Sequence, residues 1–492
     1  MLNQRKVKTT EWQTFVHLIK GNVGPGCLSL PWAISQLGVV VGVLSIVCLS
    51  LWTSYNCWVI VLLKRHIEGQ ATQSGENPYE VTNITYPELG NWAYGKRFRN
   101  FISSCICTLQ LAICTVFMSF IGENLNVALA RWFHPISHTW VILLSLPGIL
   151  VLVCGFPSLK SLAPVTVAAT ASLFLGFGLL AVIICQEWKD RPDQAPRIHL
   201  PSLSLALCAI LYSFEGICLV IPLESAMIRP ANFGRVFGAS MICVTFTFCL
   251  VSSICVITFG EVTNGSITAF LLQKQQDLED GALFWILLSN IVVSISVMLT
   301  YPLQLFPCLE LMGPCISRKI LYRHQDATTE LLSQDINYSD QVENHSTNYN
   351  AMNDDGETLS ARLEHHSNTN TSPFWSTDSS GILGDSLTLR LILTLFTFLV
   401  AVIVPNVQVL ISLAGALAGA SVSLLIPPML ELAYISRKEV SQENCSYGVM
   451  FSSWLRPRVR CYLSIAFGVV FLLIGTISSL MDILEVYKTP SR

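Results

Sequence analysis

The chain consists of long apolar segments separated by polar ones. Each apolar segment contains a run of about 20 residues, the length that a helix needs to cross a bilayer. The runs are continuous rather than alternating, so they predict helices and argue against the strands of a membrane barrel. The sequence therefore predicts an all-α polytopic membrane protein of about 11 spans, at residues 12–37, 38–63, 99–129, 138–157, 163–186, 203–225, 235–260, 283–311, 387–404, 407–435 and 459–484.

Two polar segments differ from the short loops between spans. Residues 1–11 form a tail that leads directly into the first span without a cleavage-site pattern, so no cleaved signal peptide is expected. Residues 317–386 are rich in Ser, Thr, Asn and Asp and poor in aliphatic residues. Because such a composition buries little apolar surface, this loop is expected to be disordered. The spans then fall into four groups, at 12–186, 203–311, 387–435 and 459–484.

The positively charged residues predict an orientation. If the spans alternate in direction, most of the 29 Lys and Arg residues lie on the same side as the N-terminus. Cytoplasmic loops carry this excess in helical membrane proteins. The N-terminus and the loop 317–386 are therefore predicted to face the cytosol. The membrane is left open between a vacuolar or lysosomal membrane and the plasma membrane.

Composition excludes several classes of protein. Hydrophobic residues make up 52% of the chain and charged residues only 12%, and the net charge of −3 gives no indication of nucleic-acid binding. The 17 cysteines fall mostly within spans and lack metal-ligand spacing with histidine, so they are interpreted as packing residues. No His-Glu-x-x-His, Gly-x-Ser-x-Gly or phosphate-loop motif is present. We therefore expect neither an enzyme nor a metal site, and no cofactor.

Spans one and six carry similar motifs. KGNVGPGCLSLP (residues 20–31) and YSFEGICLVIP (residues 212–222) both place glycine before a Cys-Leu-x-(Leu/Ile)-Pro phrase inside an apolar run. The two spans are separated by an odd number of crossings and so run in opposite directions, as in an inverted-topology repeat. Glycine and proline break a helix and free backbone N–H and C=O groups, which at this depth is tolerated where the backbone lines a cavity. The alternative interpretation is that the glycines serve close packing between helices.

Several longer stretches carry a resemblance to a known family. HLIKGNVGPGCLSLPWAISQLG (17–38), YSFEGICLVIPLESAM (212–227), TYPLQLFP (300–307) and VPNVQVLISLAGALAGASVSLLIPPMLEL (404–432) resemble the amino acid/auxin permease superfamily. They are most similar to its proton-coupled amino acid transporter group. The resemblance implies a leucine-transporter-type fold, in which the first ten spans form a 5+5 inverted repeat with helices 1 and 6 broken. It also implies symport of small neutral amino acids with protons toward the cytosol by alternating access.

The two breaks supply the predicted substrate site. Half-helix N-termini offer partial positive charge to a carboxylate. The substrate carboxylate is therefore expected at backbone groups of Gly21, Asn22, Val23, Gly24 and Gly26. The amino group is expected at the second break, at Ser213, Phe214, Glu215 and Gly216. Tyr301 in the eighth span is a candidate wall residue of the same site.

Two titratable residues are candidates for proton coupling. His17 lies one turn before the first break, and free histidine titrates at a pKa of about 6.5. The alternative is an interfacial histidine bonded to a neighbour. Glu215 is an ionisable group beside the second break; it is a candidate proton carrier or partner of the substrate ammonium, and its alternative is a helix cap.

Other polar residues near the breaks have simpler interpretations. Ser29 is left open between a substrate contact and a bond to its own helix, and Lys20 is expected to extend toward the inner interface. Glu224 and Glu431, nearer the cytoplasmic ends, are expected to be solvated.

Two other functions are kept open by the sequence. Freed carbonyl oxygens at the first and eighth spans would also suit sodium, which gives a sodium-coupled amino acid transporter. An amino-acid sensor that signals through the loop 317–386 and unidentified cytosolic partners is the second alternative. In each case the partners are small neutral amino acids and the lipid bilayer.

Overall fold

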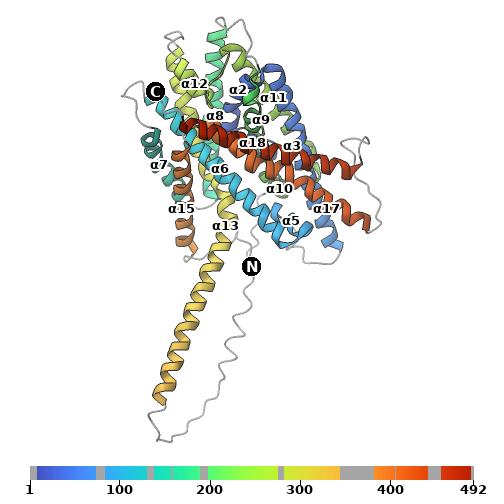
Figure 1. Cartoon of the computed structure of the whole chain (residues 1–492), viewed down its shortest axis with the longest axis vertical. Helices are drawn as coiled ribbons and strands as arrows, with labels where there is room; N and C mark the ends of the chain where they lie inside the picture. The colour runs from blue at the N-terminus through green and yellow to red at the C-terminus, as the bar shows by residue number, and fades with distance from the viewer. Residues whose placement is uncertain are drawn as a thin grey trace. The chain divides into compact units, whose positions relative to one another are not determined.

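The structure is a computed structural model of residues 1–492 (Figure 1). It describes residues 8–73, 84–129, 138–156, 159–188, 198–274, 282–343, 382–404, 406–440 and 456–488. The chain divides into two compact units. The first comprises Met1–Cys308 and Leu391–Arg492 and holds nearly all the apolar helices, and the second is Leu309–Arg390.

The described residues are helical throughout, apart from connections and one isolated bridge. The first half contains α1 (Glu11–Asn22), α2 (Pro25–Leu37), α3 (Val39–Gln73), α5 (Tyr86–Tyr94), α6 (Lys96–Leu129), α7 (His138–Gly155) and α8 (Leu159–Glu187). The second half continues with α9 (Leu203–Ser213), α10 (Ile217–Ala226), α11 (Phe233–Phe259), α12 (Ile267–Gln273), α13 (Ala282–Glu343), α15 (Ile382–Ile403), α16 (Val407–Leu413), the π-helix η6 (Ala414–Leu425), α17 (Ile426–Val440) and α18 (Pro457–Lys488).

Within the described residues, eight helical stretches are long and apolar enough to cross a membrane. They are Val39–Thr72, Lys96–Leu129, Pro164–Glu187, Leu200–Ala226, Pro230–Phe259, Leu283–Gly313, Val407–Arg437 and Pro457–Glu485. Two shorter apolar helices, Thr139–Gly155 and Leu387–Ile403, accompany them. The predicted first span corresponds to the pair α1 and α2, each too short to cross alone. The all-α polytopic fold class is therefore confirmed.

The first part of the loop 317–386, which the sequence predicts to be disordered, is helical in the structure. Residues 317–343 continue α13, which extends to Glu343. This stretch contains neither glycine nor proline and includes several good helix formers, so nothing in it terminates the helix. The polar composition thus did not prevent local helix formation. Residues 344–381 of the predicted loop lie outside the described part of the chain.

The start of α1 is fixed by local hydrogen bonds and by a contact with a distant segment. Thr10 and Gln13 form a capping box, with the Gln13 amide donating to Thr10 Oγ1 at 3.2 Å and the Thr10 amide donating to Gln13 Oε1 at 2.9 Å. The preceding residue, Thr9, forms a parallel bridge with Met227. Its amide donates to the Ala226 carbonyl at 2.8 Å, and its carbonyl accepts from the Ile228 amide at 3.0 Å.

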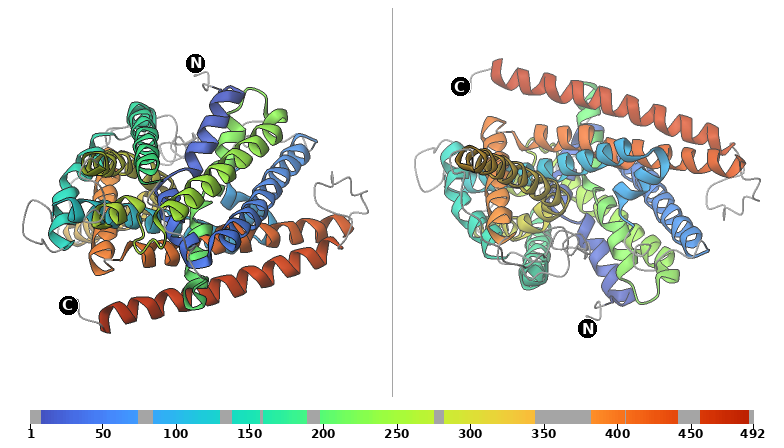
Figure 2. Two further views of the ribbon diagram at one scale, coloured as in Figure 1. Left: turned by 90° about the horizontal axis from the view of Figure 1, so that it is seen from above. Right: turned by 90° about the horizontal axis from the view of Figure 1, so that it is seen from below.

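The π-helix η6 packs closely between α9 and α18. Both views in Figure 2 show α18 alongside the η6–α17 segment. Gly415 of η6 lies directly against the backbone of α9, so that a Cβ atom at this position would overlap the carbonyl oxygen of Cys208. Gly475 of α18 faces the Cys208 Sγ atom, which a Cβ would meet at 2.5 Å. Glycine therefore sets the distance between these helices.

We expect Gly415→Ala to destabilise the helix bundle by about 1–3 kcal/mol, the usual range for overpacking. The added methyl group has no room beside the α9 backbone, so one helix must shift. Thermal unfolding of the purified protein measures the effect. Gly419→Ala in the same helix is the control, because its Cβ would meet its nearest neighbour at an ordinary 3.6 Å. Equal stability of the two variants would contradict the expectation.

Candidate functional site

The first predicted break is present between α1 and α2. α1 ends at Asn22, Val23 takes an extended conformation (φ −83°, ψ 97°), and Gly24 is also extended (φ −139°, ψ −157°). α2 then begins at Pro25, whose missing N–H and fixed φ suit the first helical position. No side chain caps the N-terminus of α2. In this first turn Pro25 has no N–H and the Cys27 amide donates to the Gly24 carbonyl at 3.0 Å, which leaves the Gly26 amide to bind an anion.

The second predicted break is present between α9 and α10. α9 ends at Ser213, and Phe214 (φ −102°, ψ 37°) leaves the helical conformation. α10 begins at Ile217 after Gly216, again without a side-chain cap. Two short-range bonds close the turn, from the Phe214 amide to the Leu211 carbonyl at 3.0 Å and from the Leu219 amide to the Gly216 carbonyl at 3.1 Å.

The two breaks lie in direct contact. A Cβ atom on Gly216 would lie 2.7 Å from the Asn22 amide group, and one on Gly26 would lie 2.9 Å from Ser213 Oγ. One on Gly21 would lie 2.6 Å from Leu219 Cδ1. These three glycines therefore serve close packing, which was the alternative interpretation of the motif. The structure therefore places the residues predicted at the first break in contact with those predicted at the second break.

Gly24 differs from the other glycines of the breaks. A Cβ atom on it would meet no atom within 4 Å, and its φ of −139° is available to any residue. Neither packing nor backbone conformation accounts for a glycine here. The open space beside Gly24 lies next to the uncapped N-terminus of α2. It has room for a small solute.

The hydroxyl and amide side chains at the breaks mostly bond to their own helices. Ser29 Oγ donates to the Gly26 carbonyl at 2.8 Å, and Ser213 Oγ donates to the Ala209 carbonyl at 3.1 Å. Asn22 Nδ2 donates to the Leu18 carbonyl at 2.9 Å. For Ser29, this is the local alternative that the sequence left open.

Glu215 is the acidic group of the second break. Its Oε2 atom is buried and has no hydrogen-bond partner in the described part of the chain. The Tyr212 ring and the Cys114 thiol of α6 lie within electrostatic range of the carboxylate. The helix-cap interpretation does not apply, since no side chain caps α10.

Two aromatic residues predicted at the site make packing contacts. Phe214 is 2% exposed, and its ring centroid lies 5.2 Å from that of Phe248 on α11. Tyr301 of α13 is fully buried, with its hydroxyl 2.6 Å from Thr397 Oγ1 of α15. Tyr301 therefore joins two helices, and Cys114 lies within electrostatic range of it as well as of Glu215.

His17 and Lys20 lie on α1 before the first break. The His17 side chain is on an exposed face of α1, and its charged neighbour is Lys20. Lys20 reaches across to α8, where its Nζ atom donates to the Thr166 carbonyl. The lysine therefore contacts a neighbouring helix rather than the interface expected from the sequence.

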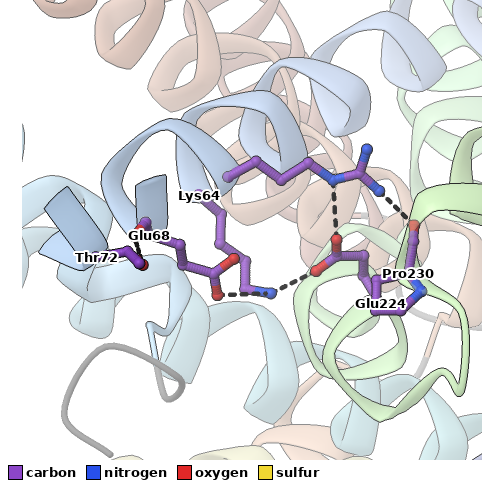
Figure 3. A network of polar contacts seen from close by, with 6 residues as sticks. Lys64, Glu68, Thr72, Glu224 and Pro230 are labelled. Carbon is purple, nitrogen blue, oxygen red and sulfur yellow. Dashed lines mark hydrogen bonds and ion pairs between the residues drawn. The ribbon is translucent and has the colours of Figure 1, made fainter. Parts of the chain in front are cut away.

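The expectation that Glu224 is solvated is wrong. It is 2% exposed and forms ion pairs with Lys64 and with Arg65, the latter at 3.0 Å (Figure 3). Lys64 also pairs with Glu68 at 3.2 Å, and Arg65 donates to the Pro230 carbonyl at 2.6 Å. The cationic side chains of Lys64 and Arg65 on α3 therefore cover the Glu224 carboxylate at the end of α10. Sequence patterns within one span give no information about such pairing between spans.

Glu431 is also buried, contrary to expectation. It is 3% exposed, accepts from the Tyr55 hydroxyl at 2.8 Å, and forms an ion pair with Arg460. The Arg460 guanidinium lies over the Tyr55 ring, 5.0 Å from its centroid. The side chains of Tyr55, Glu431 and Arg460 therefore connect α3, α17 and α18.

An all-helical membrane protein with two spans broken side by side has the architecture typical of secondary transporters, which bind solute at such breaks. Sequence comparison identifies the family: the chain belongs to the transmembrane amino acid transporter protein family, whose family model matches residues 7–481. The family is one of transporters rather than enzymes. Among the described residues, no group of three or more His, Cys, Asp or Glu side chains is placed to hold a metal ion.

Several curated relatives share this assignment. The chain is 22% identical over 318 residues to the proton-coupled amino acid transporter-like protein pathetic of Drosophila melanogaster, covering 63% of this chain and 65% of that protein. The match thus spans just under two thirds of the Drosophila protein. The amino acid transporters AVT3C and AVT3B of Arabidopsis thaliana are 26% and 25% identical over 328 residues, covering 71% and 73% of their lengths and 63% of this chain.

Among solved structures, the chain is similar to Mhp1, a nucleobase-cation-symport-1 family transporter in a closed conformation with bromovinylhydantoin bound. The TM-score is 0.47 at 11% sequence identity, and the match covers 98% of this chain and 93% of that one.

Proposed function

We propose that the protein is a secondary active transporter that carries small neutral amino acids together with protons toward the cytosol. The observation that carries the proposal is the contact between the two breaks, where Gly24 faces open space beside the uncapped start of α2. Substrate binds between the two broken helices, and the site opens to each side of the membrane in turn. The two halves that contain these helices form a 5+5 inverted repeat, with the N-terminus in the cytosol.

The zwitterion of an amino acid matches the two breaks. The substrate carboxylate binds to backbone amides at the first break, around Gly24, where the positive end of the α2 dipole favours an anion. The ammonium binds at the second break, where α9 ends and Glu215 supplies a carboxylate. A small side chain suits the close approach of the half-helices at Gly21, Gly26 and Gly216.

The coupling proton is assigned to His17, or to Glu215 in place of its pairing with the substrate ammonium. Glu215 lies at the second break with an unpartnered buried carboxylate oxygen, which a proton neutralises at low cost. His17 lies on an exposed face of α1, one turn before the first break. Protons then reach Glu215 when the site is open. The membrane is a vacuolar or lysosomal membrane or the plasma membrane.

Uptake of labelled alanine, glycine and proline into proteoliposomes tests this function. We expect uptake driven by an inward proton gradient and unchanged when sodium is replaced by choline. Uptake that required sodium and ignored the proton gradient would replace the proton by sodium as the coupling ion. Binding without any steady flux would identify a sensor instead.

We expect His17→Ala to retain substrate binding but to lose the response of uptake to an imposed pH gradient. Removal of the imidazole takes away a group that changes its charge near neutral pH. His199→Ala is the matched control, because His199 is an exposed histidine that precedes α9 and pairs with Glu261 at 3.6 Å. A wild-type pH response in His17→Ala, together with its loss in Glu215→Gln, would assign the coupling to Glu215 alone.

A further inference from the structure

Within the described part of the chain, three buried polar atoms without hydrogen-bond partners lie around the second break. They are Glu215 Oε2, the Tyr212 hydroxyl and Gln110 Oε1. Tyr212 is 1% exposed and Gln110 is 3% exposed. Gln110 belongs to α6, which is continuous, whereas the other two residues belong to the broken span. Buried polar groups in folded proteins are nearly always hydrogen-bonded, so three unpartnered atoms near one another require a physical reason.

The three side chains are linked through two cysteines. The Gln110 side chain hydrogen-bonds the Cys218 thiol of α10, which leaves its carbonyl oxygen Oε1 unpartnered. Cys218 lies within electrostatic range of Glu215. Cys114, one helical turn after Gln110 on α6, lies within electrostatic range of both Glu215 and Tyr212. Side chains of α6, α9 and α10 therefore converge on the same break.

The chemistry of these atoms specifies what would satisfy them. A carboxylate oxygen and an amide oxygen only accept hydrogen bonds, and a phenol oxygen can also accept. Leaving such acceptors buried and unpaired destabilises the folded protein. One proton on Glu215 supplies a single donor. A primary ammonium supplies three donors and a positive charge, which matches three acceptors that include one carboxylate.

We propose that Gln110 and Tyr212, together with Glu215, form the subsite that binds the substrate's ammonium group. The proposal rests on the proposed transport function and extends the site to α6. Gln110 then connects the substrate to an unbroken helix while Glu215 and Tyr212 connect it to a broken one. Ligands with fewer ammonium N–H groups lose contacts at this subsite, so it favours primary amines over N-methylated ones and over proline, whose secondary ammonium has two N–H donors and should bind more weakly than alanine.

The test compares ligands that differ only in the number of N–H donors. Uptake and ligand-induced thermal stabilisation are measured for alanine, N-methylalanine and N,N-dimethylalanine, in the wild type and in Gln110→Met. Methionine has nearly the length and volume of glutamine but lacks its strong acceptor. We expect Gln110→Met to weaken alanine binding about tenfold, since it removes a hydrogen bond to a charged group. The loss should be much smaller for the dimethylated analogue.

Two further variants keep the test decisive. Ser119→Ala removes another unpartnered buried polar atom from α6, nine residues after Gln110 and so on the opposite face of that helix, and it should leave all three ligands unaffected. Tyr212→Phe removes only the hydroxyl and should reproduce the selective loss of alanine if Gln110→Met fails to fold. Equal weakening of alanine and the dimethylated analogue would overturn the subsite. Failure of the wild type to bind or transport any amino acid would instead overturn the proposed function.

Discussion

Replacement of Glu224 by alanine is expected to destabilise the protein by about 3–5 kcal/mol, the usual cost of removing one partner from a buried ion pair. The Lys64 and Glu224 side chains are each 3% exposed, and Arg65 also contacts the carboxylate (Figure 3). Without the carboxylate, the Lys64 ammonium remains buried with only Glu68 as a counter-charge. Thermal unfolding of the detergent-solubilised protein measures the loss.

Two variants separate this effect from simple loss of a charge. Glu68→Ala removes a carboxylate that also pairs with Lys64 but is 29% exposed, so it should cost no more than about 1 kcal/mol. The double variant Lys64→Met, Glu224→Leu removes both charges and should recover much of the stability, because an apolar pair of similar volume needs no desolvation of ions. If Glu224→Ala and Glu68→Ala were equally stable, the buried pair would not be important for the fold.

Gly24→Leu is expected to abolish transport while leaving the fold intact. Open space beside Gly24 accepts the start of a side chain without a clash, and the backbone there is available to any residue. A leucine side chain fills that space, where the proposed site binds the substrate carboxylate. Uptake into proteoliposomes and the unfolding temperature are measured on the same preparation.

Gly178→Leu on α8 is the matched control, because it also adds a side chain to open space, on an exposed face of that helix. It should retain transport. Gly26→Ala should behave in the opposite way to Gly24→Leu: its Cβ would lie 3.0 Å from the Ser213 Cα atom, so stability falls. Normal uptake by Gly24→Leu would remove the basis for a site at the first break.

The breaks in the two spans could be predicted from the sequence because their cause is local. Gly24 and Pro25 interrupt one helix, and Gly216 the other, through the properties of those residue types. Which glycines pack and which face open space could not be predicted, because this depends on the opposite helix. Gly26 and Gly24 are two residues apart and have different surroundings.

The acidic residues and the α6 contribution were missed for a related reason. Glu224 and Glu431 receive their partners from helices far away in the sequence, such as α3 and α18. Gln110 did carry a local signal, since an amide within an apolar span is costly and often functional. Its relation to Glu215 becomes apparent only when α6 and α10 are packed together.

The bridge between Thr9 and Met227 has a consequence for movement of the transporter. Backbone bonds on both sides of Thr9 join the free end of α1 to the segment that follows α10, and Asn232 donates to Glu11 at 2.7 Å nearby. The outermost turns of both interrupted spans are therefore bound to each other at one membrane face. We therefore expect a displacement of either half-helix to be transmitted to the other, so that the two move as a single body in the proposed alternating access.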